Sequence, residues 1–476
     1  MTPSFDAQSV MADVSAVWAA DIVPTMHDYI AIPALSPAFD AEWAANGHMG
    51  RAVDLVADWC RSRPIRGLTV EVAEIPGRTP LVVMEIPASG SGSNDDPVLL
   101  YGHLDKQPEM VGWRDGLGPW TPVLDGERLY GRGGADDGYA AFASLTAIEA
   151  VQRAGGSHAR CVVLVEASEE SGSPDLPAHL AALADRVGTP SLVLCLDSGC
   201  ADYNRLWATT SLRGLAGGTL VVEILEEGAH SGAASGVVPS TFRIARQLVE
   251  RVEDGTTGEI RLAELHTDVP DDRRRQVEET AATTAPYASG FRFVPGANPT
   301  TDDPVEQILN HTWRPALSTI GADGLPPTTR AGNVLRPRTA LQLSFRLPPT
   351  CDSDAALAAV QAALTADPPY GARVTFSGRE SGQGWNAPPF APWLDTALEQ
   401  ASQLAWGAPY RAFGEGGTIP FMGMLGRQFP DAQFLITGVL GPESNAHGPN
   451  EFLHLPTGER VTAALAVVLD HHATRG

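Results

Sequence analysis

Four short apolar segments, each ending in polar residues, constrain the fold of this chain more than any other feature. They are PVLLYGHLD from residue 97, ARCVVLVEASEE from 159, PSLVLCLDSG from 190 and AQFLITGVLG from 432. Their β-branched content and turn-rich flanks predict buried strands. An Ala-rich helical stretch closed by Gly155 and Gly156 separates the first two segments. Strands that alternate with helices predict an α/β domain with a mainly parallel sheet and helices on both faces.

The middle of the chain shows a different pattern. Alternating strand segments and two amphipathic helices predict a small α+β domain with one covered sheet face, over residues 207–384. The helix expected over 392–407 and the last apolar segment return to the first pattern. We therefore expect an inserted domain at 207–384 within a split domain of residues 1–206 and 385–476. Residues 251–305 show weak periodicity and are expected to be irregular.

Composition excludes several classes of partner. The formal net charge of −24 and the lack of a basic stripe argue against nucleic acid and anionic membranes. No apolar run approaches the roughly 20 residues that span a bilayer. The N-terminus lacks a basic region of the secretory type, and the five cysteines include no CxxC pair. We expect a cytoplasmic protein without a disulfide framework.

Acidic and histidine residues follow the expected strands. The candidates are His103, Asp105, Asp136, Asp137, Glu169, Glu170, Asp197 and His447. Singly, each could be a turn residue or a helix N-terminus, but the carboxyl ends of parallel strands meet in one cleft. Imidazole with carboxylate suits Zn²⁺, with Mn²⁺ or Co²⁺ as alternatives, and so many ligands predict a pair of ions. Such ions would offset the adjacent charges of Glu169 and Glu170.

Asp105 is expected to support the metal ligand His103. The two residues are at positions i and i+2 of a strand, so they share a face. The Asp105 carboxylate would then accept a hydrogen bond from the distal imidazole nitrogen and fix its tautomer.

Six motifs resemble those of a known family. GHLD, LYGRGGADD, EASEESGSPD, LDSG, GAHSG and EGGTIP occur in this order. They resemble the M20 family of dizinc metallopeptidases, and most nearly its carnosinase-like dipeptidase branch, as does WRPALSTIGADG in the insert. The resemblance covers nearly the whole chain. It implies a split zinc-peptidase catalytic domain with an inserted α+β, ferredoxin-like domain that serves as lid and dimerisation domain.

The resemblance implies two Zn²⁺ per subunit and a role for each ligand. His103 and Asp197 would complete one site, Glu170 and His447 the other, and Asp136 would bridge the ions. The peptide bond from Asp136 to Asp137 would be cis. Glu169 would act as general base and then as general acid.

The resemblance also implies substrate contacts in the inserted domain. His230 would reach the active site of a partner subunit in a homodimer and stabilise the oxyanion. Asn333 and Arg346 would hold the substrate, with Arg346 on its C-terminal carboxylate. Further backbone donors to that carboxylate would come from Gly416, Gly417 and Thr418.

The sequence departs from the family pattern at two places. Asp137-Gly138-Tyr139 stands where Asp-Lys-Gly is usual. Gly414 stands where an arginine is usual, and the nearby Arg411 is a candidate replacement.

The function expected from the sequence is an exopeptidase that cleaves short peptides, most readily dipeptides. An N-acyl-amino-acid deacylase, an amidase or a carboxypeptidase on the same scaffold is the first alternative. A non-catalytic metal-binding scaffold is an alternative of another class.

Overall fold

The computed structural model describes residues 5–475, apart from the side chains of residues 379, 380 and 420. The chain forms two compact units. Unit 1 comprises the chain up to Thr210, Ala387–Phe413 and the chain from Met424 on; unit 2 comprises Ser211–Asn386 and Gly414–Gly423. Residues 414–423, which the sequence analysis assigns to the catalytic domain, thus belong to unit 2.

The largest sheet is mixed, with a parallel centre. Its strands, in spatial order, are β1 (Thr69–Ala73), β2 (Leu81–Ile86), β6 (Cys161–Glu166), β3 (Val98–His103), β7 (Leu192–Cys195), β17 (Gln433–Ile436), β8 (Trp207–Leu212) and β15 (Trp385–Asn386), with β16 (Arg411–Glu415) also paired to β8. The four apolar segments of the sequence form β6, β3, β7 and β17, which pair in parallel. The neighbouring strands β1, β2 and β15 pair antiparallel.

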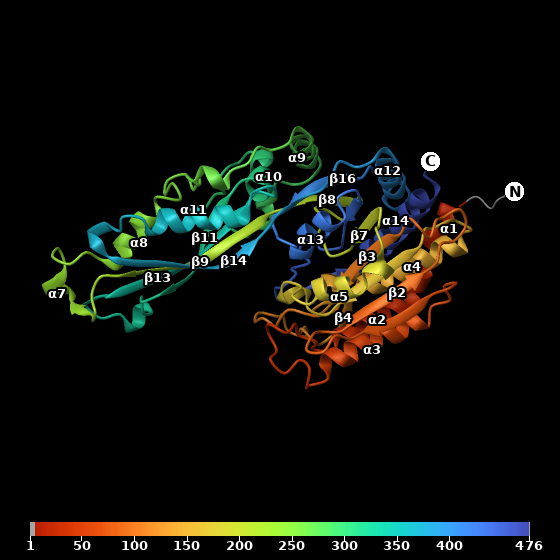
Figure 1. Ribbon diagram of the computed structural model, residues 1–476, viewed down its shortest axis with the longest axis horizontal. Helices are drawn as coiled ribbons and strands as arrows, with labels where there is room; N and C mark the ends of the chain where they lie inside the picture. The colour runs from red at the N-terminus through yellow and green to blue at the C-terminus, as the bar shows by residue number, and fades with distance from the viewer. Residues whose placement is uncertain (1–4, 476) are drawn as a thin grey trace. The chain divides into compact units, whose positions relative to one another are not determined.

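The central strands are buried on both faces, as expected of parallel strands. In β3, Val98 and Leu100 face the large core, and Leu99 and Tyr101 on the opposite face are also buried. The Ala-rich helix α4 (Ala140–Arg153) contacts β3 and the C-terminal helix α14 (Leu455–Thr474). Figure 1 shows α4 and α14 among the helices of this unit.

The remaining helices and strands of this part of the chain complete the core and its edges. They are α1 (Ala7–Val17), α2 (Val23–Ile30), α3 (His48–Arg61), α5 (Leu176–Ala182), α6 (Ala184–Val187), α12 (Pro392–Trp406), α13 (Pro420–Gln428, which unit 1 shares with unit 2), β4 (Val123–Asp125), β5 (Arg128–Tyr130) and β18 (Phe452–His454). The last three strands form a separate small sheet in the order β18-β5-β4.

Unit 2 contains a four-stranded antiparallel sheet. The order is β11 (Ala316–Asp323), β13 (Arg338–Leu347), β9 (Gly214–Glu223) and β14 (Arg373–Gly382). Helices α8 (Thr241–Val249) and α11 (Ser353–Thr365) pack on the sheet (Figure 1). The chain order strand–helix–strand–strand–helix–strand, with this spatial order, is the expected ferredoxin-like arrangement.

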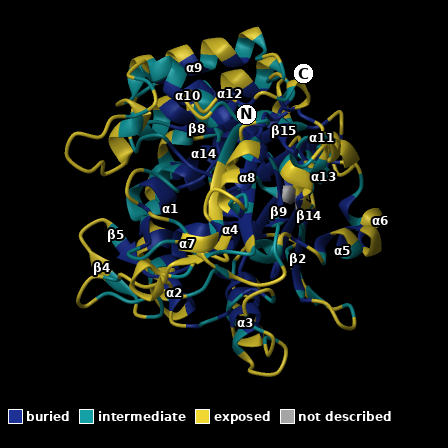
Figure 2. Ribbon diagram, turned by 90° about the vertical axis from the view of Figure 1, so that its left-hand side faces the viewer, coloured by how far each residue is buried: buried dark blue, intermediate teal, exposed yellow. Residues whose placement is uncertain are grey.

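The segment expected to be irregular contains a helix, so that expectation is wrong over α9 (Asp271–Thr283). Its residues are mostly charged, and only Arg273, Val277 and Thr280 are buried, so the apolar stripe is too narrow to reveal it. Val277 packs in a small cluster with Trp313 and residues of α10 (Pro304–Thr312). Figure 2 shows buried and exposed residues alternating around α9.

Two short strands of unit 2 lie outside the main sheet. β10 (Ala229–His230) pairs antiparallel with β12 (Val334–Leu335), and α7 (Ser231–Ala234) follows β10 directly. Within residues 5–475, none of the helices is long and apolar enough to cross a membrane. All five cysteines are buried, and within the described part of the chain none of them forms a disulfide.

Candidate metal centre

The carboxyl ends of the parallel strands carry the central residues of the site. His103 ends β3, the turn with Glu169 and Glu170 (η3, Glu169–Ser171) follows β6, and Asp197 follows β7. Nε2 of His103 lies 3.9 Å from a carboxylate oxygen of Glu169 and 3.9 Å from one of Asp197. The clustering expected from the sequence is therefore found at one edge of the sheet.

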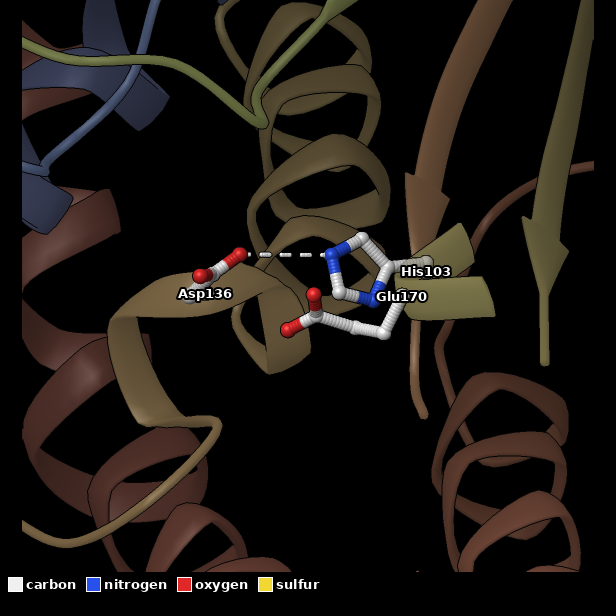
Figure 3. Close-up of side chains that lie close together, drawn as sticks. All are labelled: His103, Asp136 and Glu170. Carbon is white, nitrogen blue, oxygen red and sulfur yellow. Dashed lines mark ion pairs between the residues drawn. The ribbon is translucent and has the colours of Figure 1, made fainter. Parts of the chain in front are cut away.

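Asp136 lies between two imidazoles. One of its carboxylate oxygens is 3.3 Å from Nε2 of His103, and the other is 3.0 Å from Nε2 of His447. Nε2 of His447 is also 3.3 Å from a carboxylate oxygen of Glu170. Figure 3 shows Asp136 and Glu170 around the ring of His103. A carboxylate with one oxygen toward each imidazole has the arrangement that a bridging ligand requires.

Two sets of side chains could each hold an ion. The first is His103, Asp136 and Glu170; the second is His103, Glu169 and Asp197. His103 and Asp136 are both ligands in the sequence-based assignment. Glu169, which that assignment keeps free as a base, is close enough to His103 to belong to the second set.

The tautomer of His103 suits a metal ligand. Its Nδ1 donates a hydrogen bond to the backbone carbonyl of Asp105 at 3.1 Å, because a carbonyl can only accept. When the ring is neutral, as a metal ligand must be, Nε2 carries the lone pair. This atom is buried and has no hydrogen-bond partner among the described residues, although carboxylate oxygens surround it and raise the pKa of the ring when no cation is bound. A cation is the partner that this donor set fits.

Asp105 does more than the sequence predicts. Its carboxylate is 3.5 Å from Nδ1 of His103. The hydrogen bond from Nδ1 that the sequence assigns to this carboxylate is instead accepted by the backbone carbonyl of Asp105. The two carboxylate oxygens instead accept the backbone N–H groups of Glu169 at 3.1 Å and Glu170 at 3.0 Å. Asp105 thus joins the end of β3 to the turn that carries both glutamates.

Two further residues support the same turn and were not found from the sequence. The buried Glu166 carboxylate accepts hydroxyl groups of Tyr101, Ser168 and Ser173 at 2.5, 3.1 and 2.8 Å. Gln107 donates to the Glu170 carboxylate at 2.7 Å. The signal for Glu166 was a charged residue at the end of an otherwise apolar strand, which burial makes costly unless it is hydrogen-bonded.

The charges of the site are strongly unbalanced without a cation. Burial alone would lower the pKa of both imidazoles, but neighbouring carboxylates outweigh it and raise the pKa of His447 to about 11. Burial raises the pKa of Asp197 to about 7 and that of Glu169 well above its usual value. No lysine or arginine of the described residues forms an ion pair with these carboxylates. These crowded carboxylates form a local negative charge that a bound divalent cation would neutralise.

The departure after Asp136 has a steric cause. The peptide bond between Asp136 and Asp137 is cis, as the resemblance implies. A Cβ at Gly138 would lie 2.1 Å from the ring of Tyr29 and 2.5 Å from the carbonyl of Gly133, so a lysine does not fit. The hydroxyl of Tyr139 donates to the carbonyl of Leu196 at 2.7 Å, next to Asp197. The changed residues therefore pack against the site.

The expected substrate contacts in unit 2 form two separate groups. His230 on β10 pairs with Val334, and the carbonyl of Asn333 accepts the N–H of Ser231 at 2.9 Å. Asn333 precedes the start of β13, whereas Arg346 is at its end. The eight residue steps of strand from 338 to 346 span about 27 Å. Asn333 and Arg346 therefore lie at opposite ends of this strand.

Arg346 is tied to the EGGTIP motif. Its Nη1 donates to the hydroxyl of Thr418 at 3.3 Å, and that hydroxyl donates to the backbone carbonyl of Arg213 at 2.6 Å. A Cβ at Gly414 would lie 2.5 Å from the hydroxyl oxygen of Ser211, which leaves no space for the arginine usual there. Arg411, the proposed replacement, instead donates to the carbonyl of Tyr410 at 2.8 Å.

Comparison with known proteins gives consistent matches. The sequence model of the family described as Peptidase family M20/M25/M40 matches residues 99–471. The chain is 28% identical to a cysteinylglycine-S-conjugate dipeptidase of Corynebacterium striatum, over 78% of this chain and 80% of that protein. It is 26% identical to a Cys-Gly metallodipeptidase of Saccharomyces cerevisiae, over 81% of each. The crystal structure of human carnosine dipeptidase 1 superposes with a TM-score of 0.77 at 19% identity, covering 99% of this chain and 100% of that one.

Proposed function

Because this chain belongs to peptidase family M20/M25/M40, we propose that it is a metal-dependent dipeptidase. The observation that carries the proposal is the position of Asp136 between His103 and His447, with one carboxylate oxygen toward each. The relatives named above as dipeptidases support this substrate class over N-acyl amino acids.

The proposed cofactor is a pair of divalent cations per subunit, Zn²⁺ in the first place and Mn²⁺ or Co²⁺ as alternatives. His103 and Asp197 would hold one ion, Glu170 and His447 the other, and Asp136 both. Bound divalent cations supply Lewis acidity and lower the pKa of water.

Glu169 is the proposed general base and acid. It would take a proton from the attacking water and return it to the leaving amine, the two proton transfers that hydrolysis of an amide needs. Asp105 supports this role because its carboxylate holds the backbone N–H groups of Glu169 and Glu170. The backbone that carries the Glu169 side chain is thereby fixed by a buried neighbour rather than by solvent.

Unit 2 is proposed to recognise the substrate. Arg346 would bind the C-terminal carboxylate, with backbone donors of Gly416, Gly417 and Thr418. His230 and Asn333 lie at the opposite end of β13, further from Arg346 than a dipeptide can reach. This separation supports a homodimer through unit 2, in which His230 serves the site of a partner subunit. The five cysteines are buried and form no disulfide among the described residues, which is compatible with the proposed cytoplasmic location.

A substrate panel tests the proposal. The protein, loaded with Zn²⁺ or Mn²⁺, is assayed on free dipeptides such as Cys-Gly and β-Ala-His, on matching N-acetyl amino acids, and with EDTA. We expect chelator-sensitive cleavage of free dipeptides and a loss of at least 10³-fold in kcat for Glu169→Gln with metal retained. Cleavage of only the acetylated amino acids would establish a deacylase instead. Bound metal without any turnover would point to a non-catalytic scaffold.

A further inference from the structure

Arg213 is a buried arginine without a described acidic partner. It joins β8 to β9, and only 8% of its surface is exposed. Its Nε donates to the carbonyl of Gly416 at 3.2 Å and its Nη1 to the carbonyl of Asn310 at 3.4 Å. No carboxylate of the described residues forms an ion pair with it. Buried arginines are usually paired with acids, so this guanidinium has capacity for an anion.

The backbone of Arg213 also fixes the loop of residues 415–418. Its N–H donates to the carbonyl of Glu415 at 3.3 Å, and its carbonyl accepts the hydroxyl of Thr418 at 2.6 Å. With the contact to Gly416, one residue holds three positions of this loop. The same Thr418 hydroxyl accepts from Nη1 of Arg346, so Thr418 connects the two arginines.

His311 is a neutral side chain close to these arginines. Its Nε2 is 2.9 Å from the hydroxyl of Tyr287, and the two rings stack with centroids 4.2 Å apart. A Cβ at Gly416 would lie 2.1 Å from the His311 ring, so the loop packs directly against it. Burial and the charges of Arg213 and Arg346 lower the pKa of His311 to about 3, which keeps the ring neutral at physiological pH.

Two guanidinium charges therefore act on one small region of unit 2. Burial and the charge of Arg346 lower the pKa of Arg213 to about 10, which leaves it protonated at neutral pH. Tyr287 opposes this shift, and its phenol is neutral at that pH because burial and the charge of Glu415 raise its pKa to about 12. Paired cations of this kind are stabilised by an anion that binds between or beside them.

We propose that Arg213 is a specificity-determining residue for the C-terminal carboxylate of the substrate. It fixes the 415–418 loop that carries the backbone donors, and it adds a second positive charge to that of Arg346. The inference rests on the proposed dipeptidase function and deepens it. Its ligand is a free carboxylate; an uncharged terminal amide gains nothing from the second charge.

Selectivity between acid and amide tests this role. The ratio of kcat/KM for a cleaved dipeptide to that for its C-terminal amide is measured for the wild type, Arg213→Gln and Arg213→Lys. We expect Arg213→Gln to lower the ratio at least tenfold, through a higher KM for the free acid, with kcat and the amide nearly unchanged. Arg213→Lys keeps the charge but loses the planar fork. It should retain an intermediate ratio, whereas a purely structural role would make both variants equally poor on both substrates.

Controls separate this inference from the proposed function. Arg243→Gln removes an exposed positive charge from the same unit and should leave the ratio unchanged. If the wild type prefers the acid and the Arg213 variants keep the same ratio, the role of Arg213 is refuted and the proposed dipeptidase function still stands. A wild type that cleaves acid and amide equally would overturn the carboxylate pocket itself. If Arg213→Gln does not fold, the Arg213→Lys ratio decides: an unchanged value refutes the inference.

Discussion

The substitution Asp105→Asn should destabilise the turn that carries Glu169 and Glu170. Asp105 is fully buried, and each of its carboxylate oxygens accepts one backbone N–H of the turn. An asparagine of the same shape offers one oxygen and one NH₂ group. One backbone N–H would then face another donor, and the remaining hydrogen bond would lose its charge.

The size of the effect follows from these two hydrogen bonds. A hydrogen bond to a charged group contributes about 1.5–3 kcal/mol, and a neutral one about 0.5–1.5 kcal/mol. Asp105→Asn loses the charged hydrogen bond at one oxygen and converts the other into a neutral hydrogen bond, which together cost about 3 kcal/mol. In the metal-free protein, part of this cost is offset, because Asp105 repels nearby carboxylates. Burial and Asp197 contribute most to the raised pKa of Glu169, but the charge of Asp105 adds to it. Bound cations would cancel that repulsion, so the loss should be larger with metal.

Urea unfolding measures the stability loss with metal and without it, provided that the wild type and the variant are compared at the same free metal concentration. The free energy of unfolding is compared for the wild type and Asp105→Asn, with Mn²⁺ and with EDTA. Asp54→Asn, an exposed aspartate of α3, is the matched control and should change stability by less than about 0.5 kcal/mol. A loss below about 1 kcal/mol with metal, or a larger loss without metal, would refute the account of Asp105 given above.

Three further predictions concern other parts of the molecule. Gly138→Ala should lower the free energy of unfolding by about 1–3 kcal/mol in urea titrations, because its Cβ would meet the buried ring of Tyr29; an unchanged midpoint would contradict the packing. The folded pKa of His311, about 3, lies below its unfolded value near 6.5. Its stabilising contribution is therefore complete above pH 6.5 and lost progressively as pH falls toward 3, so His311→Gln should lose about 2–3 kcal/mol less stability than the wild type between pH 7.5 and 4.5. Equal losses would show that His311 does not titrate in this way. Removal of metal with EDTA should lower the melting temperature, and re-addition of Mn²⁺ should restore it, since a ligand that binds only the folded state stabilises that state; an unaltered melting temperature would argue against a built metal site.

The sequence alone predicted most of the strand and helix pattern and the residues that gather at the candidate metal centre. Short β-branched segments next to an Ala-rich helix specify a buried parallel sheet, because their periodicity and burial are local properties. The residues at the ends of those strands, such as His103 and Asp197, are brought together by any parallel sheet. The strand–helix order of the insert likewise predicted a small α+β domain, and the family resemblance implied its ferredoxin-like sheet.

Only the tertiary structure decided how the side chains divide their tasks. The Asp105 carboxylate could face an imidazole or two backbone N–H groups, and the packing of β3 against the turn after β6 chose the second. The charged sequence of α9 gave too little periodicity to reveal a helix that one small apolar cluster holds in place. Arg213 and Thr418 are 205 residues apart, so no local pattern could show that they share a hydrogen bond. Strand ends and periodicities are encoded over a few neighbouring residues, whereas such contacts exist only after distant segments have packed.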